Sequence, residues 1–284
     1  MKNPFVLVLT AAGGFFVHTL YATSIGLNFT DSADVTFAAA TSAGAPGFEQ
    51  ANWNHFATDW SGEVVNNALF SAGLTDDGGA NISGSVLLDV SYPGHADAAH
   101  FDANNTWRSG TGNTTSDHTL LNGYLDDGGN DQPYLNLQLA PGIYGTYHVV
   151  LYINGDGPTG STGRYWLEEW TDSLTAGNPI TDLIGVAANG GFSGTYTQAG
   201  GANFGSSATP GNQDVTGGHY LVFENISVRN LRIRGAGNGD PEAFGRAPLN
   251  AVQIIQAIPE PGSLGMCLMG LLLLRVFGCR RSCA

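Results

Sequence analysis

The sequence predicts an all-β protein, folded as a two-sheet sandwich of jelly-roll type. Short runs rich in β-branched and aromatic residues recur along the body of the chain. Turn-forming pieces such as Asp76-Asp77-Gly78-Gly79 and Asn154-Gly155-Asp156-Gly157 separate these runs. No long stretch of the body has the hydrophobic periodicity of a helix. Glycine accounts for 41 of the 284 residues, about twice its usual share, as expected for a chain with many tight turns.

The chain begins with the three parts of a secretory signal peptide. Lys2 provides a positive charge, residues 5–17 are largely apolar, and Ala22-Thr23-Ser24 has the small-x-small pattern of a cleavage site. We therefore expect a signal peptide over residues 1–24, cut by signal peptidase after Ser24 or, as the alternative, after Ala22. This pattern predicts that the protein is exported.

Residues 25–256 are expected to form the β-sandwich domain. Alternation predicts how single strands are oriented: Val86, Leu88 and Val90 share one face of a strand, and Asp89 lies on the other. Ten or so short strands joined by wide polar loops are typical of a two-sheet sandwich. The expected strands are Ile25–Phe29, Ser85–Tyr92, Leu120–Leu125, Tyr134–Leu139, Gly145–Ile153, Arg164–Glu168, Phe192–Thr197, His219–Phe223, Asn230–Arg234 and Leu249–Gln256.

Three segments of this body carry a resemblance to a known group of sandwiches. Residues 247–255 look like the last strand of galactose-binding-like sandwiches in surface proteins of planctomycete-type bacteria. Residues 120–126 and 150–156 are similar to internal segments of the same proteins. The resemblance implies a galactose-binding-like β-sandwich. It is informative about the fold and much less so about a ligand.

The C-terminal end has three parts with distinct properties. Pro259 and Pro261 fix their own φ angles and keep residues 257–261 extended, as a linker that a protease can bind. Residues 262–278 are expected to form one hydrophobic transmembrane helix. Its apolar run of 16 residues, 262–277, reaches only about 24 Å, short of the roughly 30 Å of a bilayer core. Residues 279–284 form a basic tail, which the positive-inside rule places in the cytoplasm.

This arrangement resembles the PEP-CTERM sorting signal of bacterial exosortase substrates. Pro259, Glu260 and Pro261 match the motif, and Arg280 and Arg281 match its basic end. The resemblance implies that an exosortase in the membrane recognises the three motif residues and removes the helix. The helix would then be a transient membrane anchor, with delivery to the cell envelope or the extracellular space. A lasting single-pass anchor after a proline-rich linker is the alternative.

Composition limits what the exported part can bind. Residues 25–261 hold six arginines, no lysine and 24 acidic residues, which gives a net charge of −18. This balance argues against nucleic acid as a partner, because no basic face is available for phosphates. Cys267, Cys279 and Cys283 all lie in the C-terminal segment, so the exported domain has no disulfide to stabilise it.

Two sets of residues are candidate ligand sites. Asp126, Asp127 and Asp131 offer clustered carboxylate oxygens, the donors that Ca²⁺ requires, although Asp-Gly pairs also favour turns. Trp107 and Arg108 lie in a polar loop, where an aromatic ring could stack on a sugar. Tryptophan in a domain without cysteine is also a common core residue. The sequence therefore predicts a candidate Ca²⁺ site and a candidate sugar site, each with a structural alternative.

Motifs for catalysis are absent from the sequence. It contains no Gly-x-Ser-x-Gly and no His-Glu-x-x-His. Glu168 and Glu169 are adjacent, so on a strand they point to opposite faces and cannot act as a facing acid–base pair. We therefore expect a non-catalytic structural or adhesive protein of the cell envelope or the exopolysaccharide matrix. The alternative is a carbohydrate-binding module or a glycan-active protein on the same sandwich.

Overall fold

The computed structural model of the protein describes the body of the chain and leaves out both ends and several loops. The described residues are 23–31, 36–58, 74–82, 86–91, 106–108, 114–125, 134–139, 145–155, 162–171, 178–181, 184–187, 191–200, 213–215, 217–236 and 247–257. Within these ranges no helix is long and apolar enough to cross a bilayer. The expected signal peptide, up to residue 22, and the expected transmembrane helix, residues 262–278, lie outside them.

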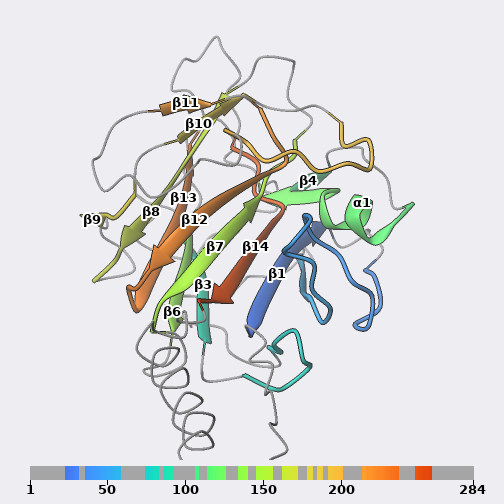
Figure 1. Cartoon of the computed structure of the whole chain (residues 1–284), viewed down its shortest axis with the longest axis horizontal. Coiled ribbons are helices and arrows are strands. Elements are labelled where there is room, and N and C mark those ends of the chain that lie inside the picture. The colour runs from blue at the N-terminus through green and yellow to red at the C-terminus, as the bar shows by residue number, and fades with distance from the viewer. Residues whose placement is uncertain are drawn as a thin grey trace, which may run out of the picture.

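The protein is all-β, and two sheets hold most of its strands (Figure 1). The five-stranded sheet has the order β12 (Tyr220–Ile226), β7 (Tyr147–Tyr152), β14 (Ala251–Gln256), β1 (Ser24–Asp31), β2 (Asn54–Thr58). The seven-stranded sheet has the order β11 (Gln213–Val215), β10 (Ile184–Ala187), β8 (Thr162–Glu169), β13 (Asn230–Ala236), β6 (Tyr134–Leu139), β3 (Val86–Ser91), with β9 (Asn178–Pro179) beside β8. A separate pair is formed by β4 (Thr106–Arg108) and β5 (Gly123–Leu125).

One hydrophobic core lies between the two sheets. Alternate residues of each strand face it: Leu135 and Leu137 of β6 on one side, Val149 and Leu151 of β7 on the other. All four side chains are buried. Figure 1 shows the layers that these side chains join, with β7 and β14 in front of β13 and β6. These residues repeat at the two-residue period of a strand with one face on the core. The predicted orientation of Val86, Leu88 and Val90 lies outside the described side chains.

A second apolar cluster covers the outer face of the five-stranded sheet. Val150 and Tyr152 of β7 point outward from the sandwich and contact residues of segments 36–53, 114–122 and 191–200. Because these segments cover the sheet, the face that alternation alone would assign to solvent is also buried. The cluster consists of Ala43, Ala45, Trp53, Leu120, Leu121, Val150, Tyr152, Phe192, Tyr220, Val222 and Ala251, with Phe37, Phe48, Tyr196 and Ile255 partly buried against it.

Most expected strands are confirmed, one is confirmed only in part, and one is wrong. The segment Leu120–Leu125 begins as the end of helix α1 (Ser116–Leu120), and only Gly123–Leu125 is a strand. The helix forms because the hydroxyl of Thr115 caps it, accepting a hydrogen bond from the His118 backbone N–H. Phe192–Thr197 is not a strand, because its aromatic side chains pack on the outer face of the five-stranded sheet instead of alternating.

Candidate functional site

Most of the residues predicted for sorting lie outside the described part of the chain. This holds for the sorting motif Pro259, Glu260 and Pro261, for Arg280 and Arg281, and for Ala22. Ser24 is described and is the first residue of β1. The last described residue, Ala257, lies one residue after β14 and two residues before the motif. The structure therefore shows the points from which both terminal segments depart.

These two points lie side by side, at what we call the terminal junction: Thr23, Ser24, Ile255, Gln256 and Ala257. The strands β1 and β14 are antiparallel neighbours, with Ser24 opposite Ile255. The Gln256 N–H donates to the Thr23 carbonyl at 2.9 Å, and the Ala257 N–H donates to the Thr146 carbonyl at 2.9 Å. The chain thus enters and leaves the fold at the same end of two paired strands (Figure 1).

Ser24 is held inside the fold by hydrogen bonds from both its side chain and its backbone. Its hydroxyl donates to Gln50 Oε1 at 2.8 Å, and its N–H donates to Asp77 Oδ1 at 3.2 Å. The residue is buried. Cleavage after Ser24 would remove these contacts, whereas cleavage after Ala22 would keep them. The position of the cut stays a prediction, and the contacts of Ser24 favour the alternative after Ala22.

A buried polar network fixes the outer face of β14 next to this junction. The Gln253 amide donates to Gln50 Oε1 at 2.8 Å and to the Phe48 carbonyl at 3.0 Å. The Tyr152 hydroxyl donates to Gln253 Oε1 at 3.1 Å and accepts from the Ala45 N–H at 3.2 Å. Burial raises the pKa of Tyr152, so the phenol stays a neutral donor. Segment 45–50 is thereby tied to the last strand.

The predicted calcium residues cannot be placed. Asp126, Asp127 and Asp131 lie outside the described residues. Among the residues that are described, no group of three or more acidic, histidine or cysteine side chains converges as metal ligands would. Asp76 and Asp77 act in a turn, where Asp76 Oδ1 accepts from the Ala80 N–H at 2.7 Å and Asp77 Oδ1 accepts from Ser24. These two aspartates fit the turn-forming interpretation of Asp-Gly.

The predicted sugar-stacking residues are placed only by their backbone. Trp107 lies opposite Tyr124 and Arg108 opposite Gly123 in the β4–β5 pair. Two other tryptophans, Trp53 and Trp170, are buried, and each indole N–H donates to backbone carbonyls of the protein interior. Trp53 and Trp170 are therefore core residues and cannot form a sugar platform. Sugar binding at Trp107 and Arg108 stays a prediction.

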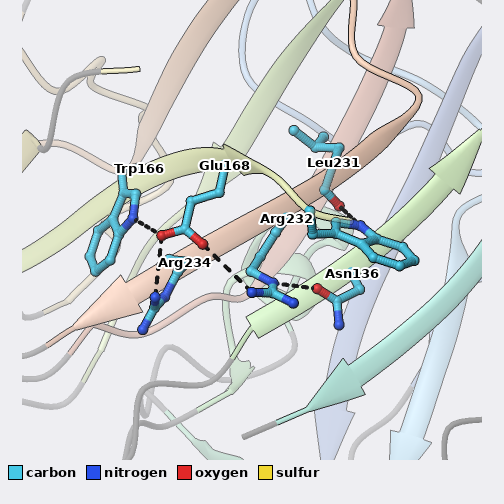
Figure 2. Close-up of polar contacts among 7 residues, drawn as sticks. Asn136, Trp166, Glu168, Leu231, Arg232 and Arg234 are labelled. Carbon is cyan, nitrogen blue, oxygen red and sulfur yellow. Dashed lines mark hydrogen bonds and ion pairs between the residues drawn. The ribbon is translucent and has the colours of Figure 1, made fainter. Parts of the chain in front are cut away.

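A charged network lies on the outer face of the seven-stranded sheet, around Glu168 (Figure 2). Glu168 Oε1 accepts from the Trp166 indole N–H at 2.7 Å and from Arg234 Nη1 at 3.2 Å. Its other oxygen lies 3.7 Å from Arg232 Nη1. Arg232 also donates through Nε to Asn136 Oδ1 at 2.7 Å. The Arg234 guanidinium stacks over the Trp166 ring, 4.9 Å from its centre.

This network has the features of one that stabilises the fold. The exposed fractions of the Arg232 and Glu168 side chains are 1% and 4%, so these charges are removed from water and compensate one another. Glu169, the next residue, is exposed on the other face of the strand. The prediction that these two carboxylates cannot form a facing pair is confirmed. Held by two cations and an indole N–H, the Glu168 carboxylate stabilises the sheet.

A cluster of aromatic rings surrounds His219 on the outer face of the five-stranded sheet. Phe192 stacks edge-on against both His219 and His118, with ring centres 5.2 Å and 5.1 Å apart. The Tyr196 hydroxyl donates to Asp117 Oδ1 at 3.2 Å, and burial raises the pKa of that tyrosine. His219 and Phe192 are buried, so these two rings mainly contact other side chains and expose little of their surface to solvent.

The free energy of unfolding is expected to fall as the pH drops below about 6.5, because two histidines are held neutral. His219 Nδ1 accepts the Thr197 N–H at 3.0 Å, which a protonated ring cannot do, and burial lowers its pKa. Burial also lowers the pKa of His55, against a smaller opposing effect of the Phe37 carbonyl. The unfolded chain thus binds more protons in this range. Urea unfolding between pH 7.5 and 5.5 measures the slope.

His219→Asn is the test variant for this pH dependence, because an amide oxygen can still accept from Thr197 and does not titrate. We expect the free energy of unfolding to change less with pH in this variant than in the wild type. His148→Asn serves as the control, since the His148 side chain is only partly buried. An equal slope in wild type and His219→Asn would show that His219 does not contribute.

Comparison of the chain with models of protein families, with curated proteins and with solved structures finds no match.

Sequence reasoning did not identify the residues that organise these sites. The sequence analysis predicted a strand over Asn230–Arg234 and assigned no role to Arg232 or Arg234, which alternate with the core residues Leu231 and Ile233. The signal that could have found them is the charge composition: with only six arginines in residues 25–261, two on alternate positions of one strand are a notable concentration. Nothing in the sequence near Gln50 or Gln253 indicates their contact.

Proposed function

We propose that this chain is an exported protein that is sorted by an exosortase and has a non-catalytic structural or adhesive role in the cell envelope or the exopolysaccharide matrix. The terminal junction carries the proposal. A fold whose first and last strands pair in this register brings the two chain exits, Thr23 and Ala257, to one end of the sandwich. Signal peptidase and exosortase could therefore each remove a segment without cutting through the sandwich.

The body is proposed to be a jelly-roll sandwich of the galactose-binding-like type. Support comes from the path of the chain, which changes sheet between β6 and β7, between β7 and β8, and again on both sides of β13. Apart from the parallel pairs β1–β2 and β10–β11, neighbouring strands are antiparallel. Repeated crossing between two largely antiparallel sheets is characteristic of jelly rolls and related Greek-key sandwiches. The folded body is stabilised by its core without cysteine, which suits an exported domain with no disulfide.

The mature protein is expected to lack both terminal segments. Mass spectrometry of the intact protein from the envelope fraction should show a chain that begins at Thr23 or Ile25 and ends before Gly262. The contacts of Ser24 favour Thr23 as the first residue. The measurement gives both ends at once, because each pair of cleavage sites predicts a distinct mass.

The control is Glu260→Ala, which changes the motif and leaves the described fold untouched. It should accumulate as the membrane-bound form that still contains Arg280 and Arg281. Envelope material with an intact Arg280-Arg281 end in the wild type would exclude sorting by cleavage. It would instead support the lasting single-pass anchor.

A further inference from the structure

Two neighbouring strands of the seven-stranded sheet carry three arginines on its outer face. Arg164 belongs to β8, and Arg232 and Arg234 belong to β13. Arg164 lies opposite Ala236 in the antiparallel register, so Arg234 is its diagonal neighbour on the same face. Such neighbours have Cα atoms roughly 7–8 Å apart. The exported part has only six arginines and no lysine, and half of these cations are therefore gathered here.

Glu168 is the counterion of Arg232 and Arg234, and it does not also pair with Arg164. Its Oε1 lies 3.2 Å from Arg234 Nη1, and its Oε2 lies 3.7 Å from Arg232 Nη1 (Figure 2). Arg164 is four residues before Glu168 on the same strand, which corresponds to about 13 Å between their Cα atoms. Trp166 lies between them. The compensation that the two arginines of β13 share therefore does not extend to the arginine of β8.

Arg164 is partly buried and has no acceptor for its charge. Its Nε is enclosed by protein atoms and makes no hydrogen bond. Among the described residues, no carboxylate forms an ion pair with its guanidinium. Its neighbours in the sheet are Gly185 on β10 and Ala236 on β13, and neither has a side chain that can accept a hydrogen bond. A guanidinium that loses water without gaining an acceptor costs free energy, so this position favours a ligand with negatively charged oxygens.

The surroundings of Arg164 favour a single carboxylate on a sugar as that ligand. The N–H groups of a guanidinium form a planar fork, which matches the two oxygens of a carboxylate. Trp166, two residues away on the same face, is partly exposed, and its ring offers an apolar surface for one side of a sugar. The exported part has a net charge of −18, which repels a polymer with closely spaced phosphates. A sugar acid with one carboxylate meets less of this repulsion.

We propose that Arg164 binds the carboxylate of a uronic acid in the surrounding polysaccharide, with the sugar ring against Trp166 and with Arg234 adding to the positive potential. The inference deepens the proposed adhesive role and rests on it for the source of the sugar. The anion site itself rests on Arg164, and it holds whether or not the terminal segments are removed. A charge-assisted hydrogen bond of ordinary net strength corresponds to a factor of about 10 to 150 in the dissociation constant.

The test compares glucuronate, glucose and acetate as ligands of the full-length protein, purified in a mild detergent. Ligand-detected NMR titration measures weak dissociation constants, and low ionic strength limits the screening of the charge. We expect glucuronate to bind about 10 to 150 times more tightly than glucose, which has no carboxylate. It should also bind more tightly than acetate, which has no ring to contact Trp166. Equal binding of glucuronate and glucose would overturn the proposal, and equal binding of glucuronate and acetate would overturn its assignment to a sugar.

Arg164→Gln should weaken glucuronate binding to the level of glucose binding. Arg229→Gln is the matched control, because it removes the same charge at an exposed position, where Nε donates to the Leu139 carbonyl at 3.2 Å. The control should bind glucuronate as the wild type does. Thermal unfolding of both variants verifies that they fold. Unchanged glucuronate binding in folded Arg164→Gln would show that the anion binds elsewhere, against the proposal.

An internal counterion is the alternative to an external one. Asp214 of β11 pairs in register with Gly185, which pairs with Arg164, so the three residues lie in one row of the sheet. Under the proposal, Asp214→Asn still binds glucuronate, as the wild type does. A wild type that does not bind glucuronate, together with an Asp214→Asn variant that does, would assign Arg164 to Asp214 and overturn the proposal. That outcome would leave the sorting prediction standing, because mass spectrometry of the mature chain tests it separately.

Discussion

Replacing Asn250 by alanine is expected to destabilise the domain by about 2–6 kcal/mol, a large part of the total stability of an ordinary domain. Asn250 is fully buried. Its amide donates to the carbonyls of Leu121 at 2.9 Å and Gly123 at 2.8 Å, and its Oδ1 accepts the Asn154 N–H. Alanine would leave the Gly123 carbonyl and the Asn154 N–H without this partner, at about 1–3 kcal/mol each. The Leu121 carbonyl would keep the Asn154 side-chain amide as a donor, at 3.2 Å. Urea unfolding of the purified domain measures the loss.

The matched control for Asn250 is Asn230→Ala on β13. Asn230 is only partly buried, and its Oδ1 accepts a hydrogen bond from Gln138 Nε2 at 3.1 Å. Water can replace that bond, so the control should lose no more than about 1 kcal/mol. Equal losses at the two positions would mean that the buried contacts of Asn250 are not what holds β5 and the end of α1 in place.

Asn250 illustrates why part of the fold could not be predicted from the sequence. A strand was predicted over Leu249–Gln256 from its run of β-forming residues, and the structure begins that strand at Ala251, directly after Asn250. The contacts of Asn250 join residues that lie more than 120 positions apart. An isolated asparagine before a strand is usually a turn residue, and no local signal distinguishes it from one that bridges three segments.

The same limit applies to strands with weak local patterns. β2 (Asn54–Thr58) was not predicted, since Asn54 and His55 are poor strand formers. It forms because β1 is a parallel neighbour and because the Asn54 amide donates to the Gly26 and Thr75 carbonyls, at 2.9 Å each. Tertiary contacts outweigh propensity there. Where period-two alternation is clear, as in Tyr134–Leu139, the predicted and observed bounds agree.

The features of the terminal junction and of the Glu168 network were predictable only in part. The order of signal peptide, body and C-terminal sorting segment was inferred from composition and proline positions, and its two ends stay predictions, because they lie outside the described residues. That the terminal segments depart side by side could not be read, because it depends on the register of β1 with β14. The buried state of Glu168 was also beyond the sequence, although its opposite orientation to Glu169 followed from strand geometry.

Glu168→Gln is the second change expected to have a large effect, with a loss of about 3–5 kcal/mol in the free energy of unfolding. Glutamine has nearly the same shape, so the change removes a charge and leaves the packing. The carboxylate lies between Arg234, at 3.2 Å, and Arg232, at 3.7 Å, and it also accepts the Trp166 indole N–H (Figure 2). Without its negative charge, two buried guanidinium groups lose a shared counterion. Chemical denaturation of the purified domain measures the effect.

Glu169→Gln is the matched control for Glu168, because it is the same substitution one residue away, at the exposed end of β8, and it should change stability by no more than about 0.5 kcal/mol. The double variant Glu168→Gln with Arg234→Met then separates charge from packing. Removing one cation together with its counterion should recover part of the loss, which gives a coupling free energy between the two side chains. Strictly additive losses would show that Glu168 stabilises the sheet by packing alone. The charge compensation assigned to this network would then be wrong.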